Sequence, residues 1–201
     1  MTTWLFVRHA ESVANAEGWL AGQRDAPLTA EGRRRARKLG AILSSRHFDR
    51  VFASDLSRAR DTARLLVGDR VPIVEVPALR ERALGAWEGQ RRAALTDDGR
   101  LARLLDWKGR PPGGESLADV ARRMIDWLAT VPDDGLSLVV AHGAILRATL
   151  TRLDGLPDAL AGTWALRNLD HLERTVAQAT WGQLARDLAA PAPPDRPGSM
   201  T

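Results

Sequence analysis

The 201-residue chain contains no cysteine, which excludes disulfide bonds, thiolate metal sites and a cysteine nucleophile. This absence is compatible with a cytoplasmic location, which we expect for the protein. A long hydrophobic run is also missing, because Arg8 and His9 end the apolar stretch Trp4–Val7. Such a short stretch is neither the core of a secretory signal nor a membrane-spanning helix, so we expect no membrane partner and a mature chain that begins near Met1.

Lysine and aromatic residues are scarce. Lys38 and Lys108 are the only lysines, so the net charge of +4 comes almost wholly from arginine. Positive charge suits anionic partners but does not distinguish a nucleic acid from a phosphorylated metabolite. Aromatic residues make up only 5% of the chain and offer no obvious platform for stacking bases. The arginine-rich run Arg33–Arg37 fits the solvated face of a helix, and we predict no nucleic-acid partner.

The rest of the composition is typical of a folded protein. Hydrophobic residues make up 44% of the chain and charged residues 27%. A chain of this length is the size of one domain and buries roughly 70% of its unfolded surface. We predict a single domain over residues 1–190, followed at 191–201 by a proline-rich, disordered tail.

Short apolar runs that end in polar residues alternate with helical patterns. The predicted buried strands are Leu5–Val7, Arg50–Ser54 and Leu136–His142. The predicted helices are Thr29–Ser45, Ser57–Val67, Ser116–Val131 and a short one around Trp181–Ala189. This alternation indicates an α/β fold in which helices pack on a mainly parallel sheet.

Polar residues mark the carboxyl end of each predicted strand. They are Arg8-His9 at the first, Ser54 just ahead of Arg58 at the second, and His142-Gly143 at the third. Because ligands of such sheets bind beyond the carboxyl ends of the strands, we expect these side chains to converge on one site. The less regular stretch Leu84–Gly114 is predicted to be an excursion over the sheet edge that could cover a substrate.

Four separated motifs carry the candidate catalytic residues. They are LFVRHAES at 5–12 with Asn15, ASDLSRARDTA at 53–63, LRE at 79–81 and VAHG at 140–143, supported by DAPLT at 25–29 and GES at 114–116. In this order the motifs resemble the histidine phosphatase superfamily, also called the phosphoglycerate mutase-like proteins, from Trp4 to about Asn168. The resemblance implies a three-layer α/β/α sandwich with a mainly parallel central sheet. Ala10 replaces the glycine usual in the family, and alanine fits if this position does not require positive φ.

The resemblance also implies catalytic roles. His9 would attack a phosphoryl group and form a phosphohistidine, and its other ring nitrogen needs an acceptor, for which a carbonyl of the following loop would serve. Glu81 would protonate the leaving oxygen and then take a proton from the water that attacks the phosphohistidine. His142 would donate a hydrogen bond to the phosphoryl oxygens from the opposite side.

Phosphoryl transfer further requires positioning and neutralisation of the equatorial oxygens. Arg8 and Arg58 can supply planar bidentate donors, and Asn15 can add a neutral one. Gly22 and Gly143 could let main-chain amides approach the substrate. Two histidines plus carboxylates could in principle bind zinc, but two arginines in the same cluster would oppose a divalent cation, so we predict no metal and no other cofactor.

We therefore predict a metal-independent phosphatase that hydrolyses a small phosphorylated metabolite. One alternative is a mutase, which would return the phosphoryl group to a second hydroxyl. Family mutases that use bisphosphoglycerate generally carry a tyrosine-containing motif soon after the catalytic glutamate, whereas this chain has no tyrosine. A second alternative is an idle module that binds a phosphorylated ligand, but such a protein would be expected to have lost His9, Glu81 or His142.

Substrate specificity is expected from tryptophans and polar residues around the mouth of the site. The candidates are Trp19, Gln23, Arg24, Trp87, Arg91, Arg92, Trp107 and Arg110. The arginines would favour a second anionic group on the substrate. The tryptophans would either flank a sugar or apolar body or pack the excursion onto the core. A homodimer is a candidate assembly, although the sequence does not determine the oligomeric state.

Overall fold

The computed structural model describes residues 1–97 and 99–189, so the predicted tail at 191–201 lies outside the described residues. Its described part contains a five-stranded sheet in the order β3-β2-β4-β1-β5. The strands are β1 (Thr2–Arg8), β2 (Arg50–Ala53), β3 (Ile73–Glu75), β4 (Leu136–Ala141) and β5 (His171–Val176). Only β5 runs antiparallel to its neighbour, so the mainly parallel sheet is confirmed.

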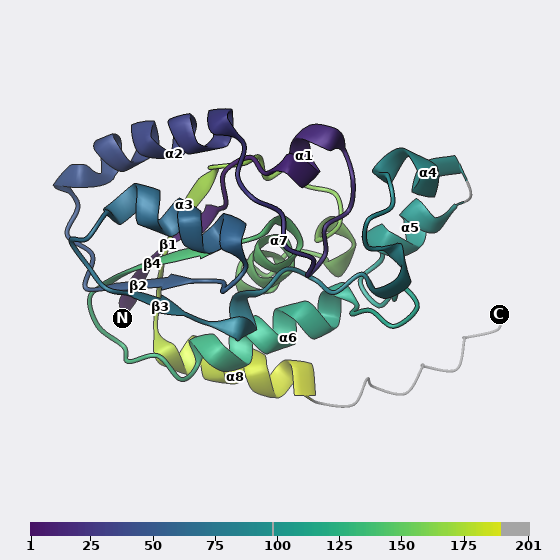
Figure 1. Cartoon of the computed structure of the whole chain (residues 1–201). Helices are drawn as coiled ribbons and strands as arrows, with labels where there is room; N and C mark the ends of the chain where they lie inside the picture. The colour runs from purple at the N-terminus through teal and green to yellow at the C-terminus, as the bar shows by residue number, and fades with distance from the viewer. Residues whose placement is uncertain (98, 190–201) are drawn as a thin grey trace.

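Helices cover both faces of the sheet (Figure 1). The first face is covered by α2 (Ala30–Ile42) and α3 (Ser57–Val67), which pack against each other. The second face carries α6 (Leu117–Leu128), α7 (Gly143–Leu153) and α8 (Gln178–Ala189), with α6 packed against both of the others. These helices and the sheet form the expected three-layer sandwich.

The alternation of side chains along β1 explains why both faces need a helical layer. Trp4 and Phe6 lie in the core cluster beneath α6, α7 and α8, whereas Leu5 and Val7 lie in the cluster beneath α2 and α3. Successive residues of a strand point to opposite faces, so a strand buried on both sides is apolar at every position. The residues of β4 divide between the two clusters in the same way.

The predicted helix boundaries are close to those of the structure. Thr29 and Ser116 are the N-caps of α2 and α6, each accepting a hydrogen bond from the main chain of the first turn. The sequence patterns missed β3, β5 and α7. Strand β3 has three residues and β5 is an antiparallel strand with exposed positions, so neither shows a continuous apolar run. Helix α7 begins at Gly143 with only His142 between it and β4, so no run of turn residues marks its start.

The excursion has a small core of its own. It contains two short helices, α4 (Arg92–Asp97) and α5 (Arg100–Leu105), and a 3-10 turn at Gly85–Trp87. Leu84, Trp87, Leu95 and Leu104 form a separate hydrophobic cluster there. Figure 1 shows α4 and α5 at the end of the molecule where α1 (Val13–Glu17) also lies, beyond the carboxyl ends of the parallel strands. Further 3-10 turns lie at Leu43–Ser45, Pro77–Leu79 and Asp158–Leu160.

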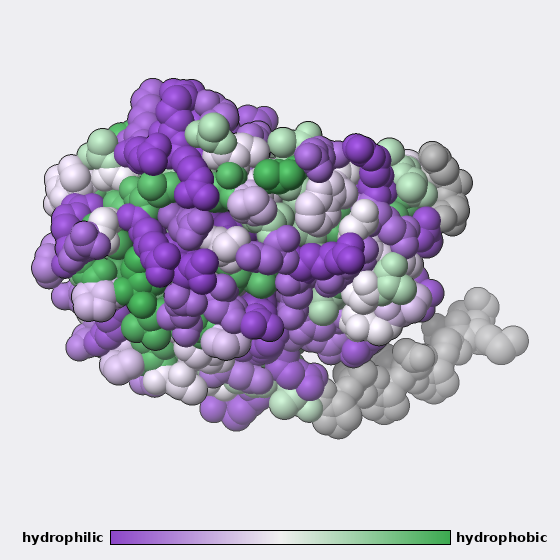
Figure 2. Space-filling model, viewed as in Figure 1, coloured by the Kyte–Doolittle hydropathy of each residue, from purple (hydrophilic) through white to green (hydrophobic). Residues whose placement is uncertain are grey.

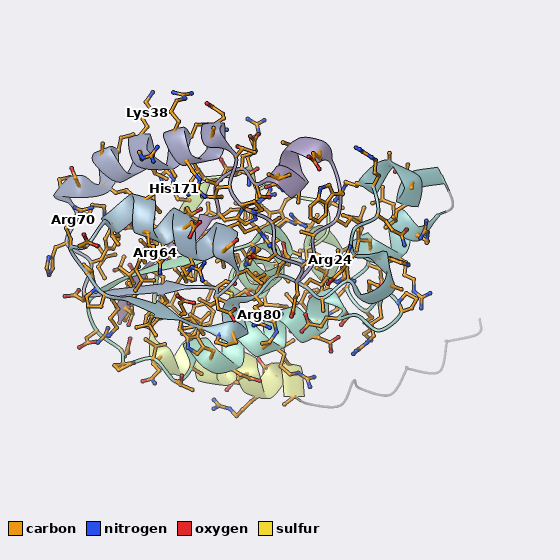
Figure 3. All side chains as sticks on the ribbon, in the orientation of Figure 1. Arg24, Lys38, Arg64, Arg70, Arg80 and His171 are labelled. Atoms are coloured by element: carbon orange, nitrogen blue, oxygen red, sulfur yellow. The ribbon has the colours of Figure 1, made fainter. Side chains whose placement is uncertain are left out.

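The face of the molecule shown in Figure 2 is largely hydrophilic. Figure 2 shows hydrophobic residues gathered mainly at the left of that view, over the β2–β3 side of the sheet. Lys38 projects outward from α2 in Figure 3, and the neighbouring Arg34, Arg35 and Arg37 are exposed, as predicted for a solvated helix face. None of the helices in the described residues has the length and apolar character needed to cross a bilayer.

Candidate active site

The register of two central strands places His9 and His142 side by side. Strands β1 and β4 are parallel and pair Arg8 with Ala141, so the next residue on each strand is one of the two histidines. The His9 amide donates to the Ala141 carbonyl at 2.9 Å. The two imidazole rings have centroids 5.0 Å apart and planes inclined at 60°. The predicted convergence of these two motifs is therefore a direct consequence of strand pairing.

One ring nitrogen of His9 is held by the main chain. Its Nδ1 lies 2.7 Å from the Ala10 carbonyl, and because a carbonyl only accepts, Nδ1 must carry the proton. The lone pair is then on Nε2. Burial, reinforced by the positive charges of Arg58 and Arg8, holds the His9 pKa well below its ordinary value of 6.5. The ring is consequently a neutral nucleophile at neutral pH, in the tautomer that leaves Nε2 free to attack.

Alanine is accommodated directly after His9. Ala10 is fully buried and does not adopt a positive φ, so this loop does not require glycine. The Ala10 amide donates to the Thr62 hydroxyl at 3.0 Å, and that hydroxyl donates to the Arg58 carbonyl at 2.6 Å. Thr62 thus connects the loop after β1 to the first turn of α3.

Arg58 is fixed by main-chain carbonyls. Its side chain is 2% exposed and donates to the Gly22 carbonyl at 2.8 Å and the Arg24 carbonyl at 2.9 Å. Arg24 lies beyond the strand ends in Figure 3. Gly22 has a φ of 53°, and a Cβ there would lie 2.2 Å from a carboxylate oxygen of Glu88. Burial lowers the pKa of the Arg58 guanidinium. No carboxylate of the described residues contacts this cation, so its charge is available to an anion.

Arg8 directly precedes His9 at the end of β1. Its Nη1 donates to the Leu166 carbonyl, and its Nε is buried without a hydrogen-bond partner. Burial lowers the Arg8 pKa, and the charge of Glu81 opposes that shift. A Cβ on Gly143 would lie 3.4 Å from Arg8 Nε and 3.3 Å from Arg147 Nη1, so the glycine lets both guanidinium groups approach the start of α7.

Glu81 lies at the amino terminus of α7. Its Oε1 accepts from the amides of Arg82 at 2.9 Å, Ala144 at 3.2 Å and Ile145 at 3.3 Å. Glu81 forms no ion pair with its neighbour Arg80 in the described part of the chain. Arg80 instead forms an ion pair with Asp55 at 2.5 Å. The free amides at the start of the helix fix the orientation of this carboxyl group at the cavity wall.

The side chain of Asn15 has a defined orientation. Its Oδ1 accepts from the Ser12 amide and from Asn168 Nδ2, each at 3.1 Å. A main-chain amide can only donate, so the atom facing it must be oxygen and the Asn15 NH2 group points elsewhere. Asn168 also donates to the His9 carbonyl at 2.9 Å. The sequence did not single out Asn168, because it lies after the last recognisable motif. Only the folded chain brings it next to His9 and Asn15.

These residues surround a cavity of about 290 Å³. The predicted residues in its wall are Arg8, His9, Asn15, Gly22, Arg58, Glu81 and Gly143. His142 is an exception, since it is fully buried against His9 and is absent from the cavity wall. Neither of its ring nitrogens has a hydrogen-bond partner among the described residues, and burial holds its pKa well below 6.5. His142 is therefore neutral, with one N–H to donate.

Two arginines of the cavity wall were not predicted as site residues. One is Arg147, on α7. The other is Arg82, which is 2% exposed and donates to the carbonyls of Leu104, Gly109 and Glu115 at 2.6, 2.7 and 2.6 Å. Burial lowers the Arg82 pKa to about 10. Its acceptors are 22 to 33 positions away along the chain, so no local pattern could reveal that it ties the excursion to the segment that carries Glu81.

The structure divides the expected specificity residues into two groups. Trp19 and Arg92 line the cavity. The other six do not line it. Trp87 and Trp107 are 5% and 8% exposed and pack into hydrophobic clusters. The four polar side chains each donate to another protein group: Gln23 to the Glu81 carbonyl, Arg24 to the Glu88 carbonyl, Arg91 to the Glu17 carbonyl and Arg110 to the Asp119 carboxylate. Packing onto the core, one of the two expectations for the tryptophans, holds for Trp87 and Trp107, and the four bonded polar side chains do not line the cavity.

Comparison with known proteins relates the whole folded part to one family. Residues 4–184 match the family model of the histidine phosphatase superfamily, branch 1. A 2,3-bisphosphoglycerate-dependent phosphoglycerate mutase of Gloeobacter violaceus is 38% identical over 78% of this chain and 77% of its own. The adenosylcobalamin/alpha-ribazole phosphatase of Escherichia coli is 34% identical over 78% of this chain and 81% of its own.

A solved structure gives the same relationship. The mycobacterial glucosyl-3-phosphoglycerate phosphatase in complex with VO3 superimposes with a TM-score of 0.74 and 31% sequence identity. The match covers 85% of this chain and 91% of that one. Relatives named as phosphatases and as mutases are thus both similar to this protein at comparable levels of identity.

Proposed function

The chain belongs to the histidine phosphatase superfamily, and we propose that it is a metal-independent phosphatase that hydrolyses a small phosphorylated metabolite through a phosphohistidine on His9. One observation carries the proposal. The imidazole of His9 is buried and neutral, and its Nδ1 proton is held by a carbonyl, which leaves Nε2 free. Arg8 and Arg58, whose positive charges act on this ring, are bonded among the described residues to main-chain carbonyls alone. This arrangement combines an oriented nucleophile with positive charge for the oxygens of a phosphoryl group.

The first half-reaction transfers the phosphoryl group to the enzyme. His9 Nε2 attacks phosphorus, the bond to the ester oxygen breaks, and Glu81 in its protonated form gives the leaving alkoxide a proton. Arg8 and Arg58 neutralise the equatorial oxygens, and Asn15 adds a neutral donor. His142 donates its one N–H toward the same group from beside His9.

The second half-reaction releases phosphate. Glu81, now a carboxylate, takes a proton from water as that water attacks the phosphohistidine. The N–P bond breaks, inorganic phosphate leaves, and His9 regains its lone pair while Glu81 regains its proton. A single carboxyl group beside the nucleophile thus serves both steps.

One feature favours hydrolysis over mutase chemistry, and a second bears on the size of the substrate. The chain has no tyrosine, whereas the motif expected after the catalytic glutamate in bisphosphoglycerate mutases contains one. The cavity of about 290 Å³ lies at the lower end of the range for ligand pockets, which supports a small substrate. A mutase, which the Gloeobacter relative is named to be, stays the second candidate.

Hydrolysis of p-nitrophenyl phosphate with EDTA present tests the proposal. The wild type is expected to turn over, and His9→Ala is expected to lose activity. His47→Ala is the matched control, because His47 is exposed and does not line the cavity. Equal activity in His9→Ala, or loss of wild-type activity in EDTA, would reject the mechanism. If the well-folded wild type does not hydrolyse p-nitrophenyl phosphate, it is assayed next with 3-phosphoglycerate. Transfer of the phosphoryl group to a second hydroxyl of that substrate would favour the mutase.

A further inference from the structure

The segment 166–170, directly before β5, holds the loop that follows β1. The Leu166 carbonyl accepts from Arg8 Nη1. The Arg8 amide donates to the Asp170 carbonyl, and the Leu169 amide donates to the Arg8 carbonyl, each at 3.0 Å. Both main-chain groups of Arg8 and its guanidinium are therefore bonded to one short segment that lies far away along the chain.

This segment contains a turn with an unfavourable backbone conformation. Leu169 has a φ of 68° and is the one residue other than glycine with a positive φ in the described part of the chain. Because a Cβ makes this left-handed region costly in free energy, the surrounding contacts must maintain it. The Leu169 side chain packs against two hydrophobic clusters, one containing Val7 and the other containing Ala10. Strain maintained in this way is typical of functional sites, and the residue that the turn presents to the site is Asn168.

Asn168 bridges the nucleophile and Asn15 with a single NH2 group. Its Nδ2 donates to the His9 carbonyl at 2.9 Å and to Asn15 Oδ1 at 3.1 Å. Within the described residues, the His9 carbonyl has no other hydrogen-bond donor. Asn168 is not among the described residues that line the cavity, so any effect on the reaction must pass through these two partners.

The orientation of the Asn15 amide decides whether it attracts or repels a phosphoryl group. Three donors meet its Oδ1 at 3.1 Å, namely the amide and hydroxyl of Ser12 and Asn168 Nδ2. The NH2 group of Asn15 is directed away from these donors, and Asn15 lines the cavity. A reversed amide would bring its oxygen toward the phosphoryl oxygens, which it would repel. Asn168 thus helps to present a donor in place of an acceptor.

We propose that Asn168 is a positioning residue for phosphoryl transfer. Its NH2 group fixes the His9 main chain relative to Asn15 and keeps the Asn15 NH2 group directed at the phosphoryl oxygens. The inference rests on the proposed function and adds to it a residue that does not touch the substrate. Because Asn168 controls the geometry of attack and not the charge of the cavity, its loss should weaken binding of the transition state more than binding of the ground state.

Asn168→Leu removes the NH2 donor and keeps the approximate size of the side chain. The kcat for p-nitrophenyl phosphate is expected to fall by about 10- to 100-fold, because small displacements of reacting groups have effects of this size, and KM should change by less than about threefold. Asn168→Gln keeps an NH2 group and should recover part of the lost kcat. Arg167→Gln is the matched control, because Arg167 belongs to the same turn but its exposed side chain does not line the cavity.

A double-mutant cycle tests whether Asn168 acts through Asn15. The loss of kcat caused by Asn168→Leu should be smaller by about threefold or more in the Asn15→Ala background, because the amide that Asn168 orients is already absent there. Equal losses in the two backgrounds would mean that the two residues act independently, and the proposal would then be wrong.

Ligand binding distinguishes positioning from a general loss of structure. Orthovanadate adopts the five-coordinate geometry of phosphoryl transfer, whereas inorganic phosphate resembles the product. In calorimetric titrations, Asn168→Leu should raise the Kd for orthovanadate by about 10- to 100-fold and the Kd for phosphate by less than about threefold. Asn168→Ser, whose side chain is too short to bridge both acceptors, gives the same comparison if the leucine variant does not fold.

These measurements also separate the inference from the proposed function. If p-nitrophenyl phosphate is hydrolysed through His9, yet Asn168→Leu keeps the wild-type kcat and the wild-type Kd for orthovanadate, the inference is wrong and the phosphatase is unaffected. Equal weakening of both ligands together with a lower urea midpoint would give Asn168 a purely structural role and would also overturn it. Full activity in His9→Ala would reject the proposed function, while the two titrations would still report on Asn168.

Discussion

Glu81→Gln should separate the two half-reactions. The amide cannot protonate a leaving group or accept a proton from water, yet it keeps the size and one oxygen of the original side chain. General acid–base catalysis contributes about 10²- to 10⁴-fold, so the kcat for an alkyl phosphate should fall by about that factor. With p-nitrophenyl phosphate the first step needs little protonation because the leaving phenolate is stable, whereas the second step still needs a base.

The structure indicates that this variant folds. Glutamine can keep its oxygen at the position of Oε1, where the Arg82 amide lies at 2.9 Å. The new NH2 group replaces Oε2, which accepts only from the Ala144 amide at 3.2 Å. One donor therefore faces another, at a cost of about 1–3 kcal/mol, which is smaller than the typical 5–15 kcal/mol stability of a domain. Thermal unfolding of wild type and variant checks this expectation.

Stopped-flow kinetics with p-nitrophenyl phosphate is the decisive assay. Glu81→Gln should release a burst of about one equivalent of nitrophenolate per site, followed by turnover slowed by about 10²-fold or more. With an alkyl phosphate both steps are slow, so quenched samples should show no burst. A variant that turns over both substrates like the wild type, or loses activity on both without a burst, would refute the role assigned to Glu81.

Other predictions concern stability and the orientation of the nucleophile. The free energy of unfolding should fall as pH drops below 6.5, by up to about 1.4 kcal/mol per unit for each histidine, because the unfolded chain protonates His9 and His142 there while burial keeps both neutral in the folded state. Urea titrations between about pH 7.5 and 5 measure how the free energy of unfolding changes with pH, and His9→Gln should reduce that change. A free energy of unfolding that rises as the pH falls would contradict the prediction. Arg82→Met leaves three main-chain carbonyls without their donor and should cost about 2–5 kcal/mol in urea unfolding, so an unchanged midpoint would count against Arg82 as the anchor of the excursion. Thr62→Val removes the acceptor of the Ala10 amide, and it should cost about 1–3 kcal/mol and lower kcat/KM for p-nitrophenyl phosphate, whereas wild-type values for both would exclude this link to His9.

The layered fold was predictable because its central strands are buried on both faces. Leu5–Val7 and residues 138–141 are apolar at successive positions, and this is the pattern of parallel strands covered by helices. The helices were recognisable from their caps, at Thr29 and Ser116, and from their apolar faces. Strand β5 was not, because an antiparallel strand with exposed positions owes its place to pairing with β1 and has no strong pattern of its own.

The candidate site was predictable where its residues follow strands. Strand register brings His9 and His142 together, so their shared position at strand ends was enough to expect proximity. Arg82 and Arg147 lie within helical or irregular segments and reach the cavity through carbonyl contacts and helix geometry. Their roles depend on three-dimensional neighbours far along the chain, and a sequence in isolation does not contain that information.

The most direct test of the account is to trap the covalent intermediate. Wild-type protein mixed with p-nitrophenyl phosphate and quenched in alkali within milliseconds should carry one phosphoryl group, and fragmentation by mass spectrometry should place it on His9. The account predicts that the modified form is labile in acid, accumulates further in Glu81→Gln and is absent from His9→Ala. A phosphoryl group on another residue, or its persistence in His9→Ala, would contradict the central claim.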